Sequence, residues 1–352
     1  MTSFRKASLI AAVAALPMAA AYRFALVYRG RAGYPRRVEA DVDPGAVGLA
    51  FEATVVRSAG VDLPAWFMPA GRGRRGPGVV LVHGWESAHH RTLPIAQFLQ
   101  AAGFHTLAFD VRGHGANPPE QAPITGGEFG ADAAAAIRAL VDRPEVDRVG
   151  VVGHSMGGVG ALIAAAAEPA VGAVVSISAP ADPYRLTRLT FRLAELPIPD
   201  PIAYPLAWLT ARVYAKPRGH RIEDISASRA IARIAAPILL VHGAVDTVIP
   251  PDHLKRLAGH APVGTKTYLV EGGGHSWLYE DAGFRRTVAA FLAASLGGRL
   301  TPEQAAERAA AVDARRMVEA VDRRDFSAVE EAPRPSLLAA EIAGLRRRVA
   351  RR

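Results

Sequence analysis

Val149-Gly-Val-Val-Gly-His-Ser-Met-Gly157 is the stretch that decides the fold. Val149 to Val152 is a short apolar run typical of a buried parallel strand, and the residues from Met156 onward favour a helix. A Gly-x-Ser-x-Gly motif between a strand and a helix is a nucleophile elbow. The turn is so tight that a side chain at position 153 or 157 would collide across it, and Ser155 must adopt a strained backbone conformation. We therefore predict that Ser155 is a nucleophile.

A serine hydroxyl needs a base, and the base needs a carboxylate that orients it. Downstream of Ser155, one apolar run leads into a turn that ends at Asp246, and the next leads through three glycines to His275. We predict that His275 takes the proton from Ser155 and that Asp246 holds its imidazole in the right tautomer. Asp182, just after the preceding apolar run, is a rival acid, but the turn at Asp246 matches the usual site better.

Backbone N–H groups that stabilise a developing oxyanion are the third requirement. Upstream of the elbow, an apolar run ends in His83-Gly84-Trp85. We expect the N–H groups of Trp85 and Met156 to form the oxyanion hole, and we expect His83 to brace the loop rather than to react. The tryptophans expected to line the substrate pocket are Trp85, Trp208 and Trp277.

Short apolar runs alternate with helical segments over residues 51–296. This alternation predicts an α/β fold with a mostly parallel central sheet and helices on both faces. Residues 51–57 and 61–68 predict an antiparallel hairpin, and Gly71 to Gly78 a loop. The buried strands are expected at residues 79–82, 106–109, 149–152, 173–177, 238–241 and 267–270, and the helices at 93–102, 131–141, 156–167, 252–259 and 284–296.

One insertion interrupts this alternation, over residues 181–235. It combines six prolines with many large apolar side chains. A segment this long and apolar inside one domain is typical of a functional lid, so we expect a cap over Ser155.

The N-terminal segment differs in character from the domain. The chain carries a net charge of +9, and its first 37 residues contain no acid. Arg5 and Lys6 precede an uncharged stretch from Ala7 to Tyr22. Residues 1–28 therefore predict a signal peptide or a membrane anchor, and residues 29–50 a basic linker. The expected location is membrane-associated or exported.

Residues 297–352 are expected to form a C-terminal helical extension. Thr301-Pro-Glu-Gln304 has the pattern of a capping box, with proline at the first helical position. A second helix is expected from Ser336, with one apolar stripe opposite arginines. It would pack on the domain or lie on a membrane or a partner.

The composition excludes several classes of function. The chain has no cysteine, so thiol nucleophiles, disulfides and cysteine-bound metals are excluded. His89, His90 and His114 lack further ligands at metal-binding spacing, so we expect no metal site. The basic runs have no interleaved aromatic residues, so we expect no nucleic-acid partner.

Taken together, these motifs resemble the α/β-hydrolase family, most closely its monoacylglycerol lipases, lysophospholipases, small esterases and serine aminopeptidases. The resemblance covers residues 51–296. It rests on five features: His83-Gly84, the Asp110 to Gly115 turn, the elbow around Ser155, Asp246 with Val248-Ile249-Pro250, and His275. The family implies an acyl-enzyme mechanism on an ester, thioester or amide, without metal or cofactor.

The leading hypothesis is a membrane-associated serine hydrolase (carboxylesterase or lipase type) that cleaves an ester with an apolar acyl chain. An acyltransferase would use the same acyl-enzyme with an alcohol or amine as acceptor. An aminopeptidase would need acids near the pocket, for which Glu195 and Asp200 are available. A non-catalytic binding protein is the last alternative, because all three members of the triad are present.

Overall fold

The computed structural model describes residues 2–71 and 75–313, with residues 2–14 described by their backbone alone. Its centre is an eight-stranded sheet in the order β1-β2-β4-β3-β5-β6-β7-β8. Strands β3 to β8 pair in parallel, and the hairpin β1-β2 adds antiparallel to β4. The strands are β1 Glu52–Ser58, β2 Val61–Met68, β3 Gly76–Val82, β4 His105–Phe109, β5 Val146–His154, β6 Val171–Ile177, β7 Ile238–Gly243 and β8 Lys266–Val270.

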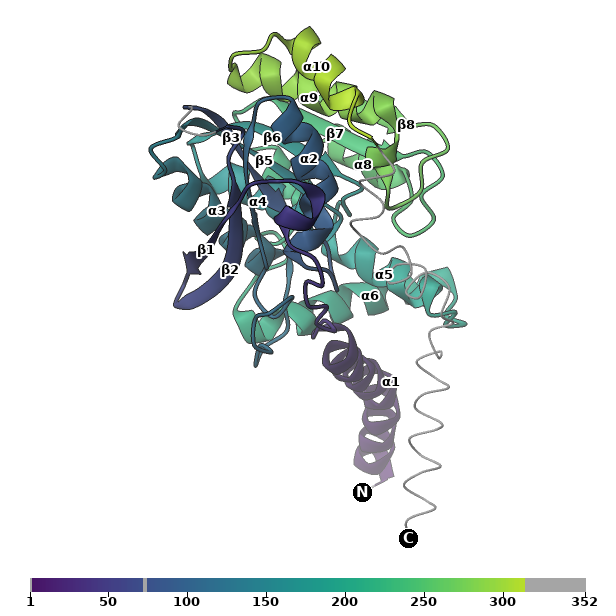
Figure 1. The fold of residues 1–352 in the computed structure, drawn as a ribbon. Coiled ribbons are helices and arrows are strands. Elements are labelled where there is room, and N and C mark those ends of the chain that lie inside the picture. Colours follow the sequence, from purple (N-terminus) through teal and green to yellow (C-terminus); the bar gives the residue numbers. More distant parts are fainter. Residues whose placement is uncertain (1, 72–74, 314–352) are drawn as a thin grey trace.

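Helices cover both faces of the sheet, as predicted (Figure 1). Alternate residues of each strand point to opposite faces, so Val80 and Val82 enter one buried cluster while Val79 and Leu81 enter the other. The first cluster holds helices α3, α4, α7 and α8, and the second holds α2, α9 and α10. Their bounds are α2 Leu93–Ala101, α3 Gly126–Val141, α4 Met156–Ala167, α7 Ala227–Ile231, α8 Asp252–Ala258, α9 Ala282–Leu296 and α10 Pro302–Ala310.

Every predicted strand and helix of the domain is present, and several begin earlier than predicted; β3, β5 and α3 do so by three residues or more. β3 begins at Gly76 rather than at residue 79, because Gly76 already pairs with Val146 of β5. α3 begins at Gly126 rather than at residue 131, because Thr125 caps it. The Thr125 hydroxyl accepts the Gly127 N–H at 3.0 Å, and the Glu128 carboxylate accepts the Thr125 N–H at 2.7 Å. This capping box marks the start of the helix in the sequence. The prediction placed the start later because it relied on the alanine run that follows.

The predicted insertion forms a helical unit between β6 and β7. It consists of α5 Pro183–Leu193, α6 Asp200–Ala215, the short 3-10 helix η3 Lys216–Arg218, and α7. Figure 1 shows α5 and α6 beside α1 at one end of the molecule, away from α9 and α10. We call residues 181–235 the cap.

Helix α1 runs from Thr2 to Ala32 and so extends into the segment predicted as a linker. The physical reason is packing against the cap, which holds Tyr28 and Arg29 in helical geometry: the Tyr28 hydroxyl bonds Thr190 Oγ1 at 2.8 Å. Among the helices that the structure describes, none combines the length and the apolar character needed to cross a bilayer. The 3-10 helix η1 Pro44–Val47 lies within the rest of the predicted linker.

The capping box at Thr301 is confirmed and starts α10, which packs on α9. The Thr301 hydroxyl accepts the Gln304 N–H at 3.3 Å, and the Gln304 side chain accepts the Thr301 N–H at 3.0 Å. The helix predicted from Ser336 lies outside the described residues.

Candidate active site

Ser155 sits between the end of β5 and the start of α4 with φ 55° and ψ −120°. A positive φ is unfavourable for a residue with a side chain, and the surroundings hold it in place. The Ser155 N–H donates to the carbonyl of Ile177 on β6 at 2.8 Å. A Cβ on Gly153 would lie 2.1 Å from the Gly157 carbonyl oxygen, and one on Gly157 would lie 2.2 Å from the Val82 oxygen. The elbow therefore requires both glycines, as the motif predicts.

The structure brings the three predicted residues of the triad together. His275 Nε2 lies 3.1 Å from the Ser155 Oγ, and His275 Nδ1 lies 2.8 Å from the Asp246 carboxylate. Because a carboxylate only accepts, Nδ1 carries the proton and donates it to Asp246. Nε2 is then free to accept the proton of the Ser155 hydroxyl. This is the arrangement of nucleophile, base and orienting acid.

The Asp246 carboxylate is buried and fully engaged. Its other oxygen accepts the N–H groups of Val248 and Ile249 at 2.9 and 2.8 Å. His242 Nε2 lies 3.3 Å from the oxygen that faces His275. Burial alone would raise the pKa of Asp246, but the hydrogen bonds from His242 and His275 hold its pKa well below the usual range. The acid therefore stays ionised while His275 gains and loses its proton.

Asp182, the rival acid, is occupied elsewhere. It lies at the start of α5, where it accepts the Ser226 hydroxyl at 3.1 Å and pairs with the Arg256 guanidinium. The Nε of Arg185 also lies 3.8 Å from the Asp182 carboxylate. His275 bonds Asp246 and not Asp182, so the geometry favours the acid that we predicted.

The loop after β3 lies directly against the nucleophile. A Cβ on Gly84 would lie 3.4 Å from the Ser155 Cβ, which brings the following N–H, that of Trp85, to the same region. Met156 is the first residue of α4, where N–H groups have no partner within the helix. Gly84 and Met156 thus lie beside Ser155, and the oxyanion hole formed by the N–H groups of Trp85 and Met156 stays a prediction.

His83 fixes the shape of this loop. Its Nε2 accepts the Val111 N–H at 3.0 Å, so its Nδ1 carries the proton and donates to the Gly84 carbonyl at 2.7 Å. Burial, with a smaller contribution from His114, lowers the pKa of His83 well below its ordinary value. A neutral imidazole with both nitrogens in hydrogen bonds holds the loop in place and does not react, which is the role that we predicted.

His154, at the variable position of the elbow motif, is a site residue that sequence reasoning missed. Its Nε2–H donates to the backbone carbonyl of His275 at 2.8 Å, and its ring lies 4.9 Å from the imidazole of His275. Burial, with the nearby His275, lowers the pKa of His154 to about 4, so the ring is neutral at pH 7. Nothing in the sequence marks this contact, because it joins the end of β5 to a loop that is distant along the chain.

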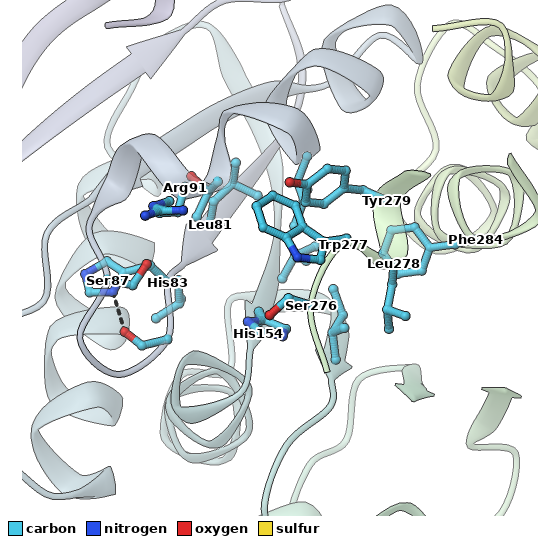
Figure 2. A pocket seen from close by; sticks show the side chains of 16 residues that line it. Leu81, His83, Ser87, Arg91, His154, Ser276, Trp277, Leu278, Tyr279 and Phe284 are labelled. Atoms are coloured by element: carbon cyan, nitrogen blue, oxygen red, sulfur yellow. Dashed lines mark hydrogen bonds between the residues drawn. The ribbon is translucent and has the colours of Figure 1, made fainter. Parts of the chain in front are cut away.

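A pocket of about 60 Å³ lies between the loop after β3 and the loop that carries His275 (Figure 2). Gly84 and His154, both close to Ser155, are among the residues that line it, whereas Ser155 and His275 themselves are not. Trp277 stands in this pocket beside Tyr279, with 5.9 Å between their ring centres. Seven of the twelve remaining lining residues are aliphatic or aromatic, and the other five are polar: His83, Ser87, Arg91, Thr92 and Ser276.

The other two tryptophans predicted for the pocket lie elsewhere. Trp85 packs against His114 and Phe129, with ring centres 5.3 and 6.5 Å away. Trp208 is 52% exposed on α6, under the guanidinium of Arg212. The size and apolar character of the ring favour burial, but the way the cap packs leaves this side of α6 exposed to solvent.

The acids considered for holding a substrate amine are also outside the pocket. Asp200 pairs with Arg188 at 2.5 Å, and Glu195 lies in the exposed turn between α5 and α6 with φ 52°. Among the residues that the structure describes, no three His, Asp or Glu side chains are grouped so as to hold a metal ion.

Comparison with known proteins agrees with this geometry. The model of the alpha/beta hydrolase family matches residues 79–290. An uncharacterised protein of Mycobacterium tuberculosis is 29% identical over 227 residues, which cover 64% of this chain and 72% of that protein. A Variovorax paradoxus protein with the provisional name carbamate hydrolase RutD is 30% identical over 227 residues, covering 55% of this chain and 84% of that protein.

Solved structures share the fold. An esterase of Pyrococcus furiosus superposes with a TM-score of 0.60 at 22% identity, over 75% of this chain and 98% of that chain. A puromycin-hydrolysing peptidase of Mycobacterium tuberculosis gives a TM-score of 0.55 at 24% identity, over 74% of this chain and 41% of the peptidase. At such identities the likeness concerns the fold alone.

Proposed function

Because the chain belongs to the alpha/beta hydrolase family, we propose that it is a serine hydrolase that cleaves a carboxylic ester with an apolar acyl chain through an acyl-enzyme intermediate. One observation carries the proposal: Ser155, His275 and Asp246 form a continuous hydrogen-bonded chain at 3.1 and 2.8 Å.

In the first half of the reaction, the Ser155 oxygen attacks the ester carbonyl while His275 Nε2 takes the hydroxyl proton. The carbonyl oxygen becomes an oxyanion, which the N–H groups of Trp85 and Met156 stabilise. His275 then donates its proton to the leaving alcohol, and Ser155 keeps the acyl group. In the second half, His275 removes a proton from water, the water oxygen attacks the acyl carbon, and the proton returns to Ser155.

The wall of the pocket supports an apolar acyl group. About 60 Å³ is room for a few non-hydrogen atoms, since a cavity needs on the order of 10–15 Å³ for each water-sized group. The pocket therefore suits the first carbons of an acyl chain, and the rest of a longer chain would extend beyond it. Asp200 is paired with Arg188, so it is not available to hold the amine of a peptide substrate. The peptidase alternative therefore has less support than the ester hydrolase.

Initial hydrolysis rates for 4-nitrophenyl esters from acetyl to palmitoyl test the proposal, with Ser155→Ala measured alongside. We expect a rate that depends on Ser155 and rises from acetyl to a longer chain. Thermal unfolding of both proteins controls for misfolding. Ester turnover that persists in Ser155→Ala would refute the proposal. Competing alcohols and amines in the same assay distinguish acyl transfer, which would give a new ester or amide in place of the acid.

A further inference from the structure

From Ala15 to Ala20, helix α1 leaves the body of the molecule with its side chains uncovered. Every residue from Ala15 to Ala20 is exposed, including Leu16 at 66% and Met18 at 76%. The stretch from Ala7 to Tyr22 has no charged residue. A helix that is apolar all round is ordinarily buried in protein or lipid, so its exposure requires an explanation.

The second half of α1 is fixed to the cap. Phe24 and Tyr28 place their rings edge-on against Phe191 of α5, with centres 5.3 and 5.7 Å away. The Tyr214 hydroxyl of α6 donates to the carbonyl of Ala32 at 3.0 Å. These contacts set the direction of α1, so its exposed half and the cap form one continuous part of the molecule (Figure 1).

The cap adds exposed apolar side chains of its own. Ile202, Tyr204 and Trp208 on α6 and Leu193 on α5 are 46–57% exposed. Seven of the fourteen large apolar side chains exposed among the described residues lie on α1, α5 and α6. Such clustering is unusual on a protein surface and marks a site of interaction.

Basic residues accompany this apolar surface. Helices α1, α5 and α6 carry nine arginines and lysines and one acid, Asp200, which is paired with Arg188. The guanidinium of Arg188 lies 4.2 Å over the ring of Tyr204, and that of Arg212 lies 4.0 Å over Trp208. Aromatic rings beside arginines are typical of the headgroup region of a bilayer.

We propose that α1 together with the outer sides of α5 and α6, here called the α1–cap surface, docks on an anionic phospholipid bilayer. The charge selects this occupant: two copies that met through the surface would bring arginines against arginines, whereas acidic lipids complement them. Leu16 and Met18 would enter the acyl boundary, and the arginines would meet the phosphates.

Docking would also place the site near the lipid. The cap, residues 181–235, follows shortly after the end of β6 at Ile177. The Ile177 carbonyl accepts the N–H of Ser155. The α1–cap surface is thus built on the same edge of the sheet as the nucleophile. The inference that lipid esters reach Ser155 from the bilayer rests on the proposed function. The docking of the α1–cap surface on the bilayer does not depend on it.

Vesicle co-sedimentation of the full chain carrying Ser155→Ala tests the docking without turnover. The vesicles are phosphatidylcholine alone, or phosphatidylcholine with roughly one third phosphatidylglycerol. We expect a partition coefficient at least about tenfold higher on the anionic vesicles. The pairs Leu16→Glu with Met18→Glu, and Leu193→Glu with Ile202→Glu, should each lower it about tenfold or more. Val263→Glu, at an exposed position before β8, should leave it unchanged.

Equal binding to both vesicles, no binding, or binding that both variant pairs leave intact would overturn the proposal. Sedimentation velocity of the free protein identifies the competing occupant: a dimer that the variant pairs dissociate, without vesicle binding, would assign the surface to a second copy. Hydrolysis of a soluble ester, measured with Ser155 restored, separates the two proposals. Lost turnover with intact docking refutes only the function, and intact turnover with lost docking refutes only the surface.

Discussion

Replacing Asp246 by asparagine should abolish most of the activity through the tautomer of His275. In the native protein one carboxylate oxygen accepts from Val248 and Ile249, and the other faces His275 Nδ1 at 2.8 Å. An asparagine has one accepting oxygen, which the two backbone N–H groups engage. Its NH₂ group then faces Nδ1, so His275 must move its proton to Nε2, where it can no longer accept from Ser155.

The loss of the correct His275 tautomer determines how far kcat falls. For this kind of substitution in a serine triad, kcat falls by about 10³ to 10⁴, equivalent to about 4 to 5 kcal/mol of transition-state stabilisation. We would measure kcat/KM for a 4-nitrophenyl ester at pH 7.5, with circular dichroism and thermal unfolding to show that the variant folds.

Asp182→Asn is the matched control for Asp246→Asn. Asp182 binds Ser226 and Arg256, so its replacement should change kcat/KM by less than about fivefold and should lower stability by about 1 kcal/mol. The assignment of the acid fails if Asp246→Asn keeps more than a tenth of the activity. It fails equally if Asp182→Asn loses as much as Asp246→Asn.

Three further substitutions probe other parts of the molecule. Gly157→Ala should lower stability by at least about 2 kcal/mol, because the new Cβ meets the Val82 carbonyl oxygen, and thermal unfolding would show it. The hydrogen bond to Glu128 raises the pKa of His220, so its stabilising contribution is full below about pH 6.5 and is lost as pH rises through that raised pKa. The midpoint of thermal unfolding should fall between pH 6.5 and 8.5 in the native protein but not in His220→Gln. Trp277→Ala should enlarge the pocket and raise the octanoyl-to-butyryl ratio of kcat/KM by at least about threefold.

Each of these substitutions has a counterpart elsewhere in the chain. Gly30→Ala introduces a Cβ that meets nothing within 4 Å and should leave the unfolding midpoint unchanged or raised. His260→Gln, at an exposed position, should leave the pH dependence of unfolding as it is in the native protein. Trp208→Ala should not change the chain-length preference, since Trp208 lies outside the pocket. If a control variant changes the measured property as much as the substitution it is paired with, the reasoning behind that substitution is wrong.

The sequence predicted the sheet, its helices and the triad because these depend on local patterns. Short apolar runs identify buried strands, and an elbow needs glycines on both sides of Ser155. Asp246 and His275 follow such runs directly, so the parallel sheet brings them to one edge without further information. These residues are therefore predictable from their place along the chain.

Contacts between segments that are distant along the chain could not be predicted in this way. His154 reaches the carbonyl of His275 across 121 residues, and no local pattern marks such a pair. The outward position of Trp208 depends on how the cap packs, which competes with the preference of an aromatic ring for the interior. Helix α1 continues beyond Tyr28 for the same reason, because contacts with the cap extend it past the apolar pattern.

The meeting of α1 with the cap has a consequence for proteolytic maturation. Ala19 and Ala21 are small residues at the spacing typical of a signal-peptide cleavage site. They lie where the helix changes from exposed to packed side chains. Cutting after Ala21 would remove the uncovered turns and would leave Phe24 and Tyr28 seated against Phe191. The trimmed protein would keep an intact cap, so cutting at this point would remove the exposed part of α1 from the α1–cap surface without changing the shape of the active site.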